Sequence, residues 1–262
     1  MNSVNKTLYI PLYGKALVSR QGIILEDKAA EQIWEKVQFP IKTKSRSKWL
    51  AYYMSMRTKV FDDWLRSKLA KYPEAVVLHL GCGLDSRNLR VSPKESLWYD
   101  VDFPQVIQER KKYFAECDSY RMVSSSVTDP DFLKQIPAAN TALVAMEGIS
   151  MYLTLEELAA LLRNLAEHFD QVHILMDCYT EFAAKMSRYK NPINDVGVTQ
   201  VYGMDTPEAL AAKAGLSYSG EEEMTPDALI CQLPKYQQLV FRKLYAGSMA
   251  KKLYRLYKFH SG

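Results

Sequence analysis

The feature that most constrains the fold is an alternation of short apolar runs with helix-like segments, which begins near residue 75. A chain of this pattern folds into a parallel sheet with helices on both faces, because each parallel crossover needs a dozen or more residues. The sequence therefore predicts an α/β protein. The runs expected to form the parallel strands are residues 75–80, 97–101, 120–124, 142–146 and 172–176.

Helical periodicity fills most gaps between these runs and the region before them. Thr154 is placed to cap one helix, and Pro207 falls at the first position of another. Two further runs in the C-terminal part are strand candidates. We predict a helical cap over residues 1–74 and a core over residues 75–262, together one structural unit. The predicted helices are 26–37, 45–71, 105–116, 155–168 and 206–214, and the two further strands are 216–219 and 238–243.

The composition is that of an ordinary globular protein, with 48% hydrophobic and 24% charged residues and a formal net charge of +4 over 262 residues. A charge this small does not by itself indicate nucleic-acid binding. The most apolar region, 141–162, is interrupted by acidic residues, and the N-terminal residues do not resemble a secretion signal. We therefore expect a cytoplasmic protein without a membrane span. Four cysteines without C-x-x-C spacing are expected to be free thiols, with no metal site: Cys82, Cys117, Cys178 and Cys231.

A glycine turn follows the first predicted strand, in the segment LHLGCGLDSR. Ligands of open α/β sheets bind beyond the carboxyl ends of the strands, where glycine lets them approach the backbone. Gly81 and Gly83 fit such a turn, but Ser86 stands where a dinucleotide-binding loop has its third glycine. Asp102 follows about 20 residues later, where an acid can bind ribose hydroxyls. The pattern indicates a nucleoside site without a diphosphate or, alternatively, a structural turn beside a surface acid.

Two charged residues lie where the pattern predicts burial. Glu147 directly follows the apolar run 142–146, at the edge where the ligand crevice is expected. Arg57 lies on the apolar stripe of the helix 45–71, where an unpaired guanidinium is costly. We expect Glu147 to face a cation or donor and Arg57 to face an anion. The alternatives are that Glu147 turns into solvent, and that Arg57 reaches solvent or pairs with a protein carboxylate such as Asp85.

These features together favour one ligand. S-adenosylmethionine (SAM) offers ribose hydroxyls, an ammonium and a carboxylate, and it has no phosphate. A nicotinamide-dependent oxidoreductase is the alternative enzyme, although the missing third glycine disfavours it. A SAM-binding sensor without catalysis is the alternative outside enzymes.

Most of the chain also resembles the leucine carboxyl methyltransferase family, and in particular its bacterial O-methyltransferases of the tetracenomycin type, which act in polyketide pathways. The resemblance implies a Rossmann-like class I SAM-dependent methyltransferase fold. This fold has a seven-stranded, mostly parallel sheet with helices on both faces, here with a helical N-terminal cap. The segments that carry the resemblance are SMRTKVFDDWL (55–65), LGCGLDSR (80–87), YDVDFPQVI (99–107), MEGISMYLT (146–154) and YGMDTPEAL (202–210).

The resemblance also implies roles for single residues. Arg57, and with it Lys15, would match the positions that hold the cofactor carboxylate. Gly81 would lie under the methionine part of the cofactor. Asp102 would match the ribose-binding acid, and Glu147 the acid near the methionine end.

One departure from the family concerns adenine. The family often has Asp-Leu after its third strand, whereas this chain has Ser126 and Val127. The Ser126 hydroxyl can accept a hydrogen bond from the adenine amino group, but more weakly than a carboxylate. Cys82, between Gly81 and Gly83, is expected to be a small buried turn residue rather than a nucleophile.

Methyl transfer to oxygen depends mainly on in-line positioning and exclusion of water. A carboxylate acceptor needs no general base, whereas a hydroxyl has to lose its proton. Tyr152, Asp177 and Tyr179, at or just beyond strand ends, are candidates for orienting the acceptor or for taking that proton, with plain packing as the alternative for the tyrosines. No histidine is placed at the site. We predict an O-methyltransferase that acts on a carboxylate or hydroxyl of a polyketide-like molecule or a protein C terminus and releases S-adenosylhomocysteine (SAH).

Two basic stretches, 41–50 and 241–259, interleave Lys and Arg with aromatic residues, as nucleic-acid surfaces do. In the second stretch, apolar residues at helical spacing favour a terminal amphipathic helix with a solvated basic face. The partner expected is a small-molecule or carboxyl acceptor, with RNA as the alternative and no membrane.

Overall fold

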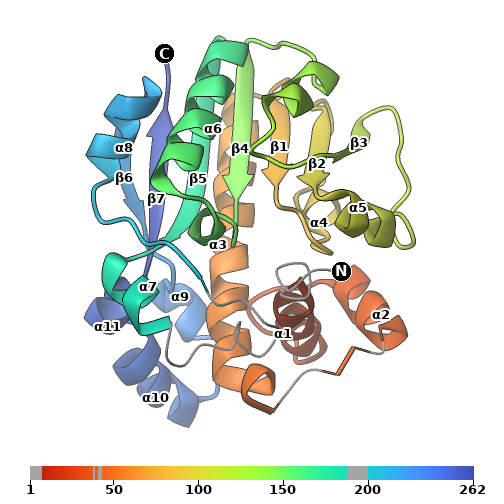
Figure 1. The fold of residues 1–262 in the computed structure, drawn as a ribbon. Helices are drawn as coiled ribbons and strands as arrows, with labels where there is room; N and C mark the ends of the chain where they lie inside the picture. The colour runs from red at the N-terminus through yellow and green to blue at the C-terminus, as the bar shows by residue number, and fades with distance from the viewer. Residues whose placement is uncertain (1–7, 38, 41–42, 188–199) are drawn as a thin grey trace.

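The computed structural model describes residues 8–37, 39–40, 43–187 and 200–262, and its strands form one seven-stranded sheet in the order β3-β2-β1-β4-β5-β7-β6 (Figure 1). The first five strands pair in parallel, and β7 lies antiparallel between β5 and β6. The predicted α/β fold with a mostly parallel sheet is therefore confirmed. The strands are β1 (Val76–Leu80), β2 (Trp98–Asp102), β3 (Tyr120–Ser124), β4 (Thr141–Met146), β5 (Gln171–Tyr179), β6 (Ser217–Glu222) and β7 (Tyr254–His260).

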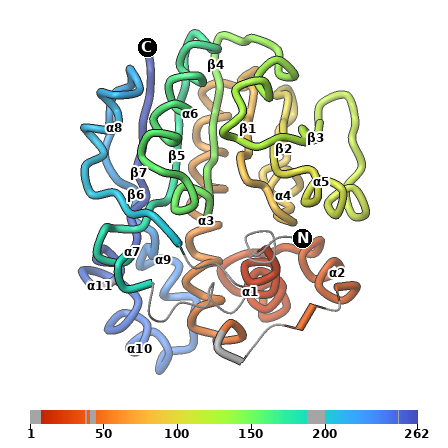
Figure 2. Tube along the Cα trace, viewed as in Figure 1, coloured from red at the N-terminus to blue at the C-terminus, as the bar shows by residue number. Residues whose placement is uncertain are grey.

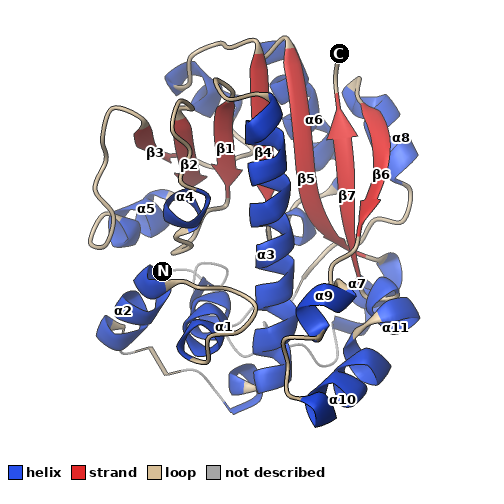
Figure 3. Cartoon of the chain, turned by 180° about the vertical axis from the view of Figure 1, so that it is seen from behind, coloured by secondary structure: helices blue, strands red, loops and turns tan. Residues whose placement is uncertain are grey.

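Helices cover both faces of the sheet and the end at which the parallel strands finish (Figures 1 and 3). In Figure 2 the red N-terminal helices and the blue helices α9 to α11 gather at that end. The cap therefore combines segments from both ends of the chain. The helices are α1 (Tyr9–Arg20), α2 (Lys28–Lys36), α3 (Lys48–Lys71), α4 (Arg87–Val91), α5 (Pro104–Arg110), α6 (Leu155–His168), α7 (Glu181–Ser187), α8 (Pro207–Ala214), α9 (Asp227–Ile230), α10 (Lys235–Tyr245) and α11 (Gly247–Lys251).

Alternation along the strands sends side chains into two cores. Val77 and Leu143 belong to the core with α3, whereas Val76 and Leu78 belong to the core with α6 and α8. Strands β1 and β4 are buried on both faces, as expected of central parallel strands. The α6 helix begins with the predicted cap, because Thr154 forms a reciprocal capping box at its first turn.

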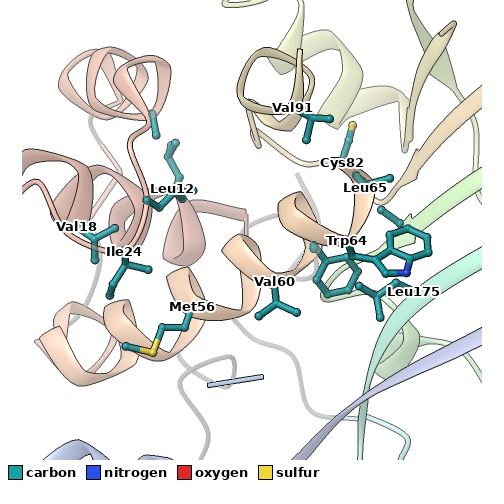
Figure 4. Packing of buried hydrophobic residues seen from close by; sticks show 14 of the residues in the cluster. Leu12, Val18, Ile24, Met56, Val60, Trp64, Leu65, Cys82, Val91 and Leu175 are labelled. Atoms are coloured by element: carbon teal, nitrogen blue, oxygen red, sulfur yellow. The ribbon is translucent and has the colours of Figure 1, made fainter. Parts of the chain in front are cut away.

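Helix α3 joins the cap to the sheet. Its 24 residues extend about 36 Å, and Figure 3 shows it running from the cap across the back of the sheet. In Figure 4, Met56 lies on the part of α3 nearer Val18 and Ile24, whereas Trp64 lies beside Leu175 of β5. One helix thus contributes to both regions, and a domain boundary at residue 74 stays a prediction.

The C-terminal region differs from two predictions. The strand predicted over 238–243 is wrong, because these residues lie in α10, where Gln237 and Phe241 are buried one turn apart. The terminal helix predicted within 241–259 is also wrong, because the chain leaves α10, forms the short α11 and then enters the sheet as β7. The apolar residues fitted helical spacing, but pairing of β7 with both β5 and β6 determines the conformation.

Other predictions differ in length only or fall outside the described residues. The helix predicted over 105–116 ends at Arg110, and β5 continues to Tyr179. Residues 1–7, 41 and 42, which belong to the N-terminal segment and the first basic stretch, lie outside the described residues. Within the described ranges, no helix combines the length and apolar character needed to cross a membrane. All four cysteines are free thiols, as predicted.

Candidate functional site

A cavity of about 530 Å³ lies at the carboxyl ends of the parallel strands. Its walls come from α1, α3, the loops that follow β1 to β5, and the C-terminal residues Met224 and Tyr254. This volume is within the range of roughly 300–1,000 Å³ that is usual for small-molecule sites. The predicted residues that line it are Lys15, Arg57, Gly81, Gly83, Asp102, Ser126, Val127, Glu147, Tyr152 and Tyr179.

The backbone conformation and the close neighbours of the turn after β1 explain why it contains glycine at two positions. Gly81 has φ +69°, and a Cβ there would lie 1.9 Å from Cγ2 of Ile149 in the loop after β4. Gly83 has φ +52°, and its N–H donates to Oδ2 of Asp102 at 2.8 Å. Both positions therefore favour glycine. The turn brings the ends of β1, β2 and β4 together at the cavity.

Asp102 ends β2 and lines the cavity. Its Oδ1 accepts the N–H of Phe103 at 2.8 Å, so both carboxylate oxygens are oriented by backbone groups. Burial raises the pKa of Asp102 to about 6, against the effect of these two hydrogen bonds. Beyond β3, Ser126 and Val127 form the next part of the wall, where the Ser126 hydroxyl is 2.7 Å from Oγ1 of Thr128.

Arg57 and Glu147 meet at the centre of the site. Glu147 follows β4, and its Oε1 accepts from Nε of Arg57 at 3.0 Å and from the hydroxyl of Thr58 at 2.8 Å. Arg57 also pairs with Asp177, whose other oxygen accepts the N–H of Gly148 at 2.7 Å. Arg57 thus pairs with protein carboxylates, but with Glu147 and Asp177 in place of Asp85. The alternative that Glu147 turns into solvent is wrong, because its side chain is 5% exposed.

Arg87 extends this pair into a network. It is fully buried, and it pairs with Glu147, with Asp62 at 2.9 Å and with Asp85 at 3.3 Å. Asp85 in turn pairs with Lys15 at 3.3 Å. The network as a whole joins four cations to five carboxylates: Lys15, Arg57, Arg87, Arg90, Asp27, Asp62, Asp85, Glu147 and Asp177.

The network lowers the pKa of two of its carboxylates, Glu147 and Asp85. Burial opposes ionisation of Glu147, but the charges of Arg57 and Arg87 outweigh it and lower the pKa to about 2. The pKa of Asp85 is also well below its usual range, because Arg90 and Lys15 outweigh its burial. In contrast, burial raises the pKa of Asp177 in spite of Arg57. Charged partners of both signs are therefore fixed in position around the cavity.

Tyrosines form the opposite part of the cavity wall, past the end of β5. Tyr179 ends β5 and is paired across the sheet with Tyr254, and their ring centroids are 4.4 Å apart in an edge arrangement. Tyr53 on α3 packs against Tyr254 at 6.2 Å. Tyr152 lies in the loop after β4. This part of the wall is aromatic, whereas the part near β1 is ionic.

The predicted residue Asp177 is placed differently from the others. It lies within β5 and is completely buried, and it is not part of the cavity wall. Sequence reasoning missed Arg87, Tyr53 and Tyr254. Arg87 had a signal, a charge directly after the glycine turn, but the tyrosines are brought to the site only by the path of α3 and by the pairing of β7.

Cys82 and the histidines behave as expected of packing residues. Cys82 is 2% exposed, and burial raises the pKa of its thiol well above the usual value, so it is not a nucleophile. The prediction that no histidine lies at the site is wrong for His79, which lines the cavity. Arg87 donates to its Nε2 at 3.0 Å, and its Nδ1 donates to Asp100 at 3.1 Å. His79 is therefore a satisfied neutral side chain. Within the described ranges, no cluster of His, Cys, Asp or Glu could hold a metal ion.

Comparison with known proteins gives relatives over most of the chain. The family model described as leucine carboxyl methyltransferase matches residues 5–166. The chain is 31% identical over 230 residues to the tetracenomycin polyketide synthesis O-methyltransferase TcmP of Streptomyces glaucescens, with 86% of this chain and 84% of that protein covered. It is 26% identical to the S-adenosyl-L-methionine-dependent methyltransferase dpfgK of Gibberella zeae, with 83% and 81% covered.

Solved structures show the same fold at low identity. A Thermobifida fusca protein aligns with a TM-score of 0.59 and 14% identity over 95% of this chain and 93% of that one. The magnesium protoporphyrin IX methyltransferase ChlM of Synechocystis, solved with SAH, aligns with a TM-score of 0.52 and 12% identity over 90% and 95%. These matches favour neither the oxidoreductase nor the sensor. The chain belongs to the leucine carboxyl methyltransferase family and is a methyltransferase that depends on SAM.

Proposed function

We propose that the protein transfers the methyl group of SAM to a carboxylate or hydroxyl oxygen of a small, polyketide-like molecule. The observation that carries this proposal is the order of polar groups along the edge of the sheet. Ser126, Asp102, Gly81 and Glu147 follow β3, β2, β1 and β4, which are adjacent strands in that order. Three inter-strand spacings cover roughly 14 Å. The order matches adenine, ribose, sulfonium and amino acid group along SAM.

In this arrangement Asp102 accepts hydrogen bonds from the ribose hydroxyls, and Ser126 and Val127 lie at the adenine. The orientation of Asp102 by Gly83 and Phe103 supports this role, because it is set before a ligand arrives. The Gly81 turn leaves the cavity wall free of a side chain at the methionine part.

Arg57 and Lys15 are proposed to hold the cofactor carboxylate, and Glu147 to hold the ammonium. The carboxylate and the ammonium of the cofactor each need a partner that can form a further hydrogen bond in addition to its ion pairs within the protein. A guanidinium has five N–H donors, and Arg57 uses three of its N–H groups on Glu147 and Asp177. The Oε2 atom of Glu147 accepts from Arg87 and has a second lone pair. Arg57 therefore has two N–H groups left and Glu147 has one lone pair left on Oε2.

The cofactor supplies an electrophilic methyl group, and the chain supplies binding, orientation and exclusion of water. A carboxylate acceptor attacks as an anion without a general base. For a hydroxyl acceptor, Tyr152 and Tyr179 are the proposed groups that orient the oxygen, since both line the cavity. Asp177 is proposed to position Arg57, because its carboxylate binds that side chain and Gly148.

The cavity supports a small acceptor over a protein C terminus or an RNA. Its volume of about 530 Å³ is that of a small-molecule site. The polyketide class is proposed from the relative TcmP, whose name gives that pathway. An RNA substrate stays the alternative, and it fails if no tRNA binding is seen at low salt, where phosphate contacts are strongest.

Calorimetry with SAM, SAH and NADH tests the cofactor, and binding of NADH without SAM would overturn the proposal. Transfer of a labelled methyl group from SAM into metabolite extracts tests catalysis. Mild alkali then separates methyl esters, which release methanol, from aryl ethers, which do not. Binding of SAM without transfer to any extract would instead support a sensor.

A further inference from the structure

The tyrosine wall of the cavity has features that the cofactor proposal does not use. Tyr179 and Tyr254 lie beyond Glu147 in strand order, on the far side from Asp102. A ligand that occupies β3 to β4 leaves this end of the cavity to the methyl acceptor. The tyrosines at this end are Tyr53, Tyr179 and Tyr254. Three methionines also line the cavity, Met54, Met151 and Met224, and Met151 packs in one cluster with Tyr179 and Tyr254.

Charge is concentrated at the other end. Among the cavity-lining residues that the structure describes, Asp85 and Asp102 belong to the β1 and β2 side, and Lys15 of α1 pairs with Asp85. Glu157 of α6 also lines the cavity, but Thr154 already binds its carboxylate. Arg57 is the ionic residue that touches the tyrosine wall, with its guanidinium carbon 5.8 Å from the ring centre of Tyr254. It pairs with two carboxylates, and its remaining N–H donors are the ones proposed to bind the cofactor carboxylate. An acceptor at this end is held by ring faces and thioethers rather than by a dedicated counter-ion.

The wall also suits flat aromatic rings in shape and polarisability. The ring planes of Tyr179 and Tyr254 are 80° apart, and those of Tyr53 and Tyr254 are 66° apart, so the wall offers both faces and edges. Edge-to-face and offset contacts are the favoured aromatic arrangements. Methionine sulfur adds favourable contacts with aromatic rings and adapts to their outline.

Tyr53 gives this end of the cavity a polar group, its hydroxyl. It is 8% exposed, and its hydroxyl is buried without a hydrogen-bond partner in the described part of the chain. A buried donor without a partner is unfavourable, and a ligand oxygen would relieve this cost. Burial raises the pKa of Tyr53, so the hydroxyl keeps its proton and can donate. Tyr53 also lies one helical turn before Arg57, next to the proposed amino acid end of the cofactor.

We infer that the acceptor subsite binds a planar aromatic compound between Tyr53, Tyr179 and Tyr254, and that the Tyr53 hydroxyl donates a hydrogen bond to an oxygen substituent of that compound. This inference rests on the proposed function. The acceptor oxygen forms the new bond to the methyl carbon, the bond from carbon to sulfur breaks, and its electron pair stays on the sulfur. With an aromatic carboxylate, one oxygen binds Tyr53 while the other attacks. A phenol gives its proton to water and attacks as the phenolate, whose oxygen accepts the hydrogen bond from Tyr53.

The test uses protein saturated with SAH and three probes: 2-naphthoate, 2-naphthol and decahydro-2-naphthoate. The first and third share a carboxylate and differ in flatness, whereas the first two share a flat ring and differ in the oxygen group. We expect calorimetry to show 2-naphthoate or 2-naphthol binding at least about tenfold more tightly than the saturated compound, because ring stacking is lost in the latter. Equal binding of the flat and saturated acids, or no binding of either naphthyl compound, would overturn the inference.

Tyr53→Phe keeps the ring and removes the hydroxyl. We expect it to weaken binding of the tighter naphthyl probe by about three- to tenfold, since one hydrogen bond is lost, while SAH affinity stays unchanged and the melting temperature does not fall, because the hydroxyl has no partner within the described part of the protein. The control is Tyr236→Phe, because Tyr236 is 65% exposed on α10 and outside the cavity wall. Unchanged probe affinity in Tyr53→Phe overturns the role of the hydroxyl. Failure of the wild-type protein to bind SAH, in contrast, contradicts the proposed function itself.

Discussion

The two ends of the cavity are built in opposite ways. The end near β1 and β4 is ionic, and its side chains bind one another: Arg87 alone contacts Glu147, Asp62, Asp85 and His79. The end past β5 is aromatic, and Tyr53 and Tyr254 contact each other through ring packing. The ionic end is the proposed cofactor site and the aromatic end the proposed acceptor site.

This difference has consequences for stability and for specificity. Removing one member of a buried ion network leaves its partners charged and unpaired, so a change there affects folding as well as binding. An aromatic wall tolerates substitution at a smaller cost, because ring packing is less directional than ion pairing. The variants below test this difference, beginning with the largest expected effect.

The largest effect is expected from Arg87→Met, which removes the cation that joins Glu147, Asp62 and Asp85. We expect the free energy of unfolding to fall by about 3–5 kcal/mol, because three carboxylates lose a buried partner. Urea denaturation monitored by circular dichroism measures this change. In the control Arg20→Ala, which breaks an exposed pair with Glu35, we expect a loss of less than about 1 kcal/mol. Similar losses in the two variants would contradict the division of the cavity.

A smaller effect, on affinity, is expected from Arg57→Ala and from Glu147→Ala. Each removes a proposed partner of the zwitterionic end of SAM, so we expect the Kd for SAM to rise at least about tenfold. Calorimetry on samples verified as folded measures the change. Lys59→Ala is the matched control, because Lys59 lies on the same helix and pairs with Asp63 at the surface. If both cavity variants bind SAM like the control, the proposed cofactor site is wrong.

The sequence predicted the two ends unequally well. At the ionic end, Gly81, Asp102 and Glu147 follow strands that apolar runs make recognisable, and the carboxyl ends of parallel strands meet at one edge. Arg57 could be found because a charge interrupts an apolar stripe. What the sequence did not predict is that Arg57 and Glu147 contact each other. A pair separated by 90 positions has no local pattern.

The aromatic end was mostly missed, and the reason is again physical. Tyr254 reaches the cavity because β7 inserts between β5 and β6, an antiparallel pairing that the local pattern of 241–259 did not reveal. The apolar residues of this segment fit a helix equally well, since a short apolar run does not distinguish the helical period of 3.6 residues from the strand period of two. Helix α10 was mistaken for a strand for the same reason. Long-range pairing, rather than local preference, determined both elements.

A third prediction uses pH to separate binding from folding at Asp102. Its pKa of about 6 lies above the usual 3.8. Protonation removes the proposed acceptor for the ribose hydroxyls, so SAM affinity should be about tenfold lower at pH 5 than at pH 7. Folding should respond with the opposite sign. A carboxyl whose pKa is raised in the folded protein contributes stability at a pH below its pKa in the unfolded chain. This contribution is lost as the pH rises through about 6.

Asp102→Asn provides the control for this pH dependence, since an amide does not titrate. We expect its SAM affinity to be low and nearly constant between pH 5 and 7 in calorimetry. Glu147 does not interfere, because its pKa is about 2 and it stays ionised over this interval. A wild-type affinity that is constant from pH 5 to 7 would contradict the role of Asp102.

The smallest effect is expected at a position outside both ends. Thr154 caps α6, where its hydroxyl accepts the N–H of Glu157 at 3.2 Å and donates to the Glu157 carboxylate at 2.8 Å. Thr154→Ala should cost about 1 kcal/mol, the usual value for a helix cap, and lower the melting temperature by roughly 2–4 °C. Thr154→Ser keeps the hydroxyl and should restore most of this loss. SAM affinity should change less than about twofold, since the side chain is not part of the cavity wall. The helix cap thus gives a reference value for the effect of an ordinary local interaction on the free energy of unfolding. A loss in Thr154→Ala as large as that in Arg87→Met would mean that the buried ion pairs stabilise the fold no more than a helix cap does. Their effect on SAM affinity would then come only from where they hold the charged groups.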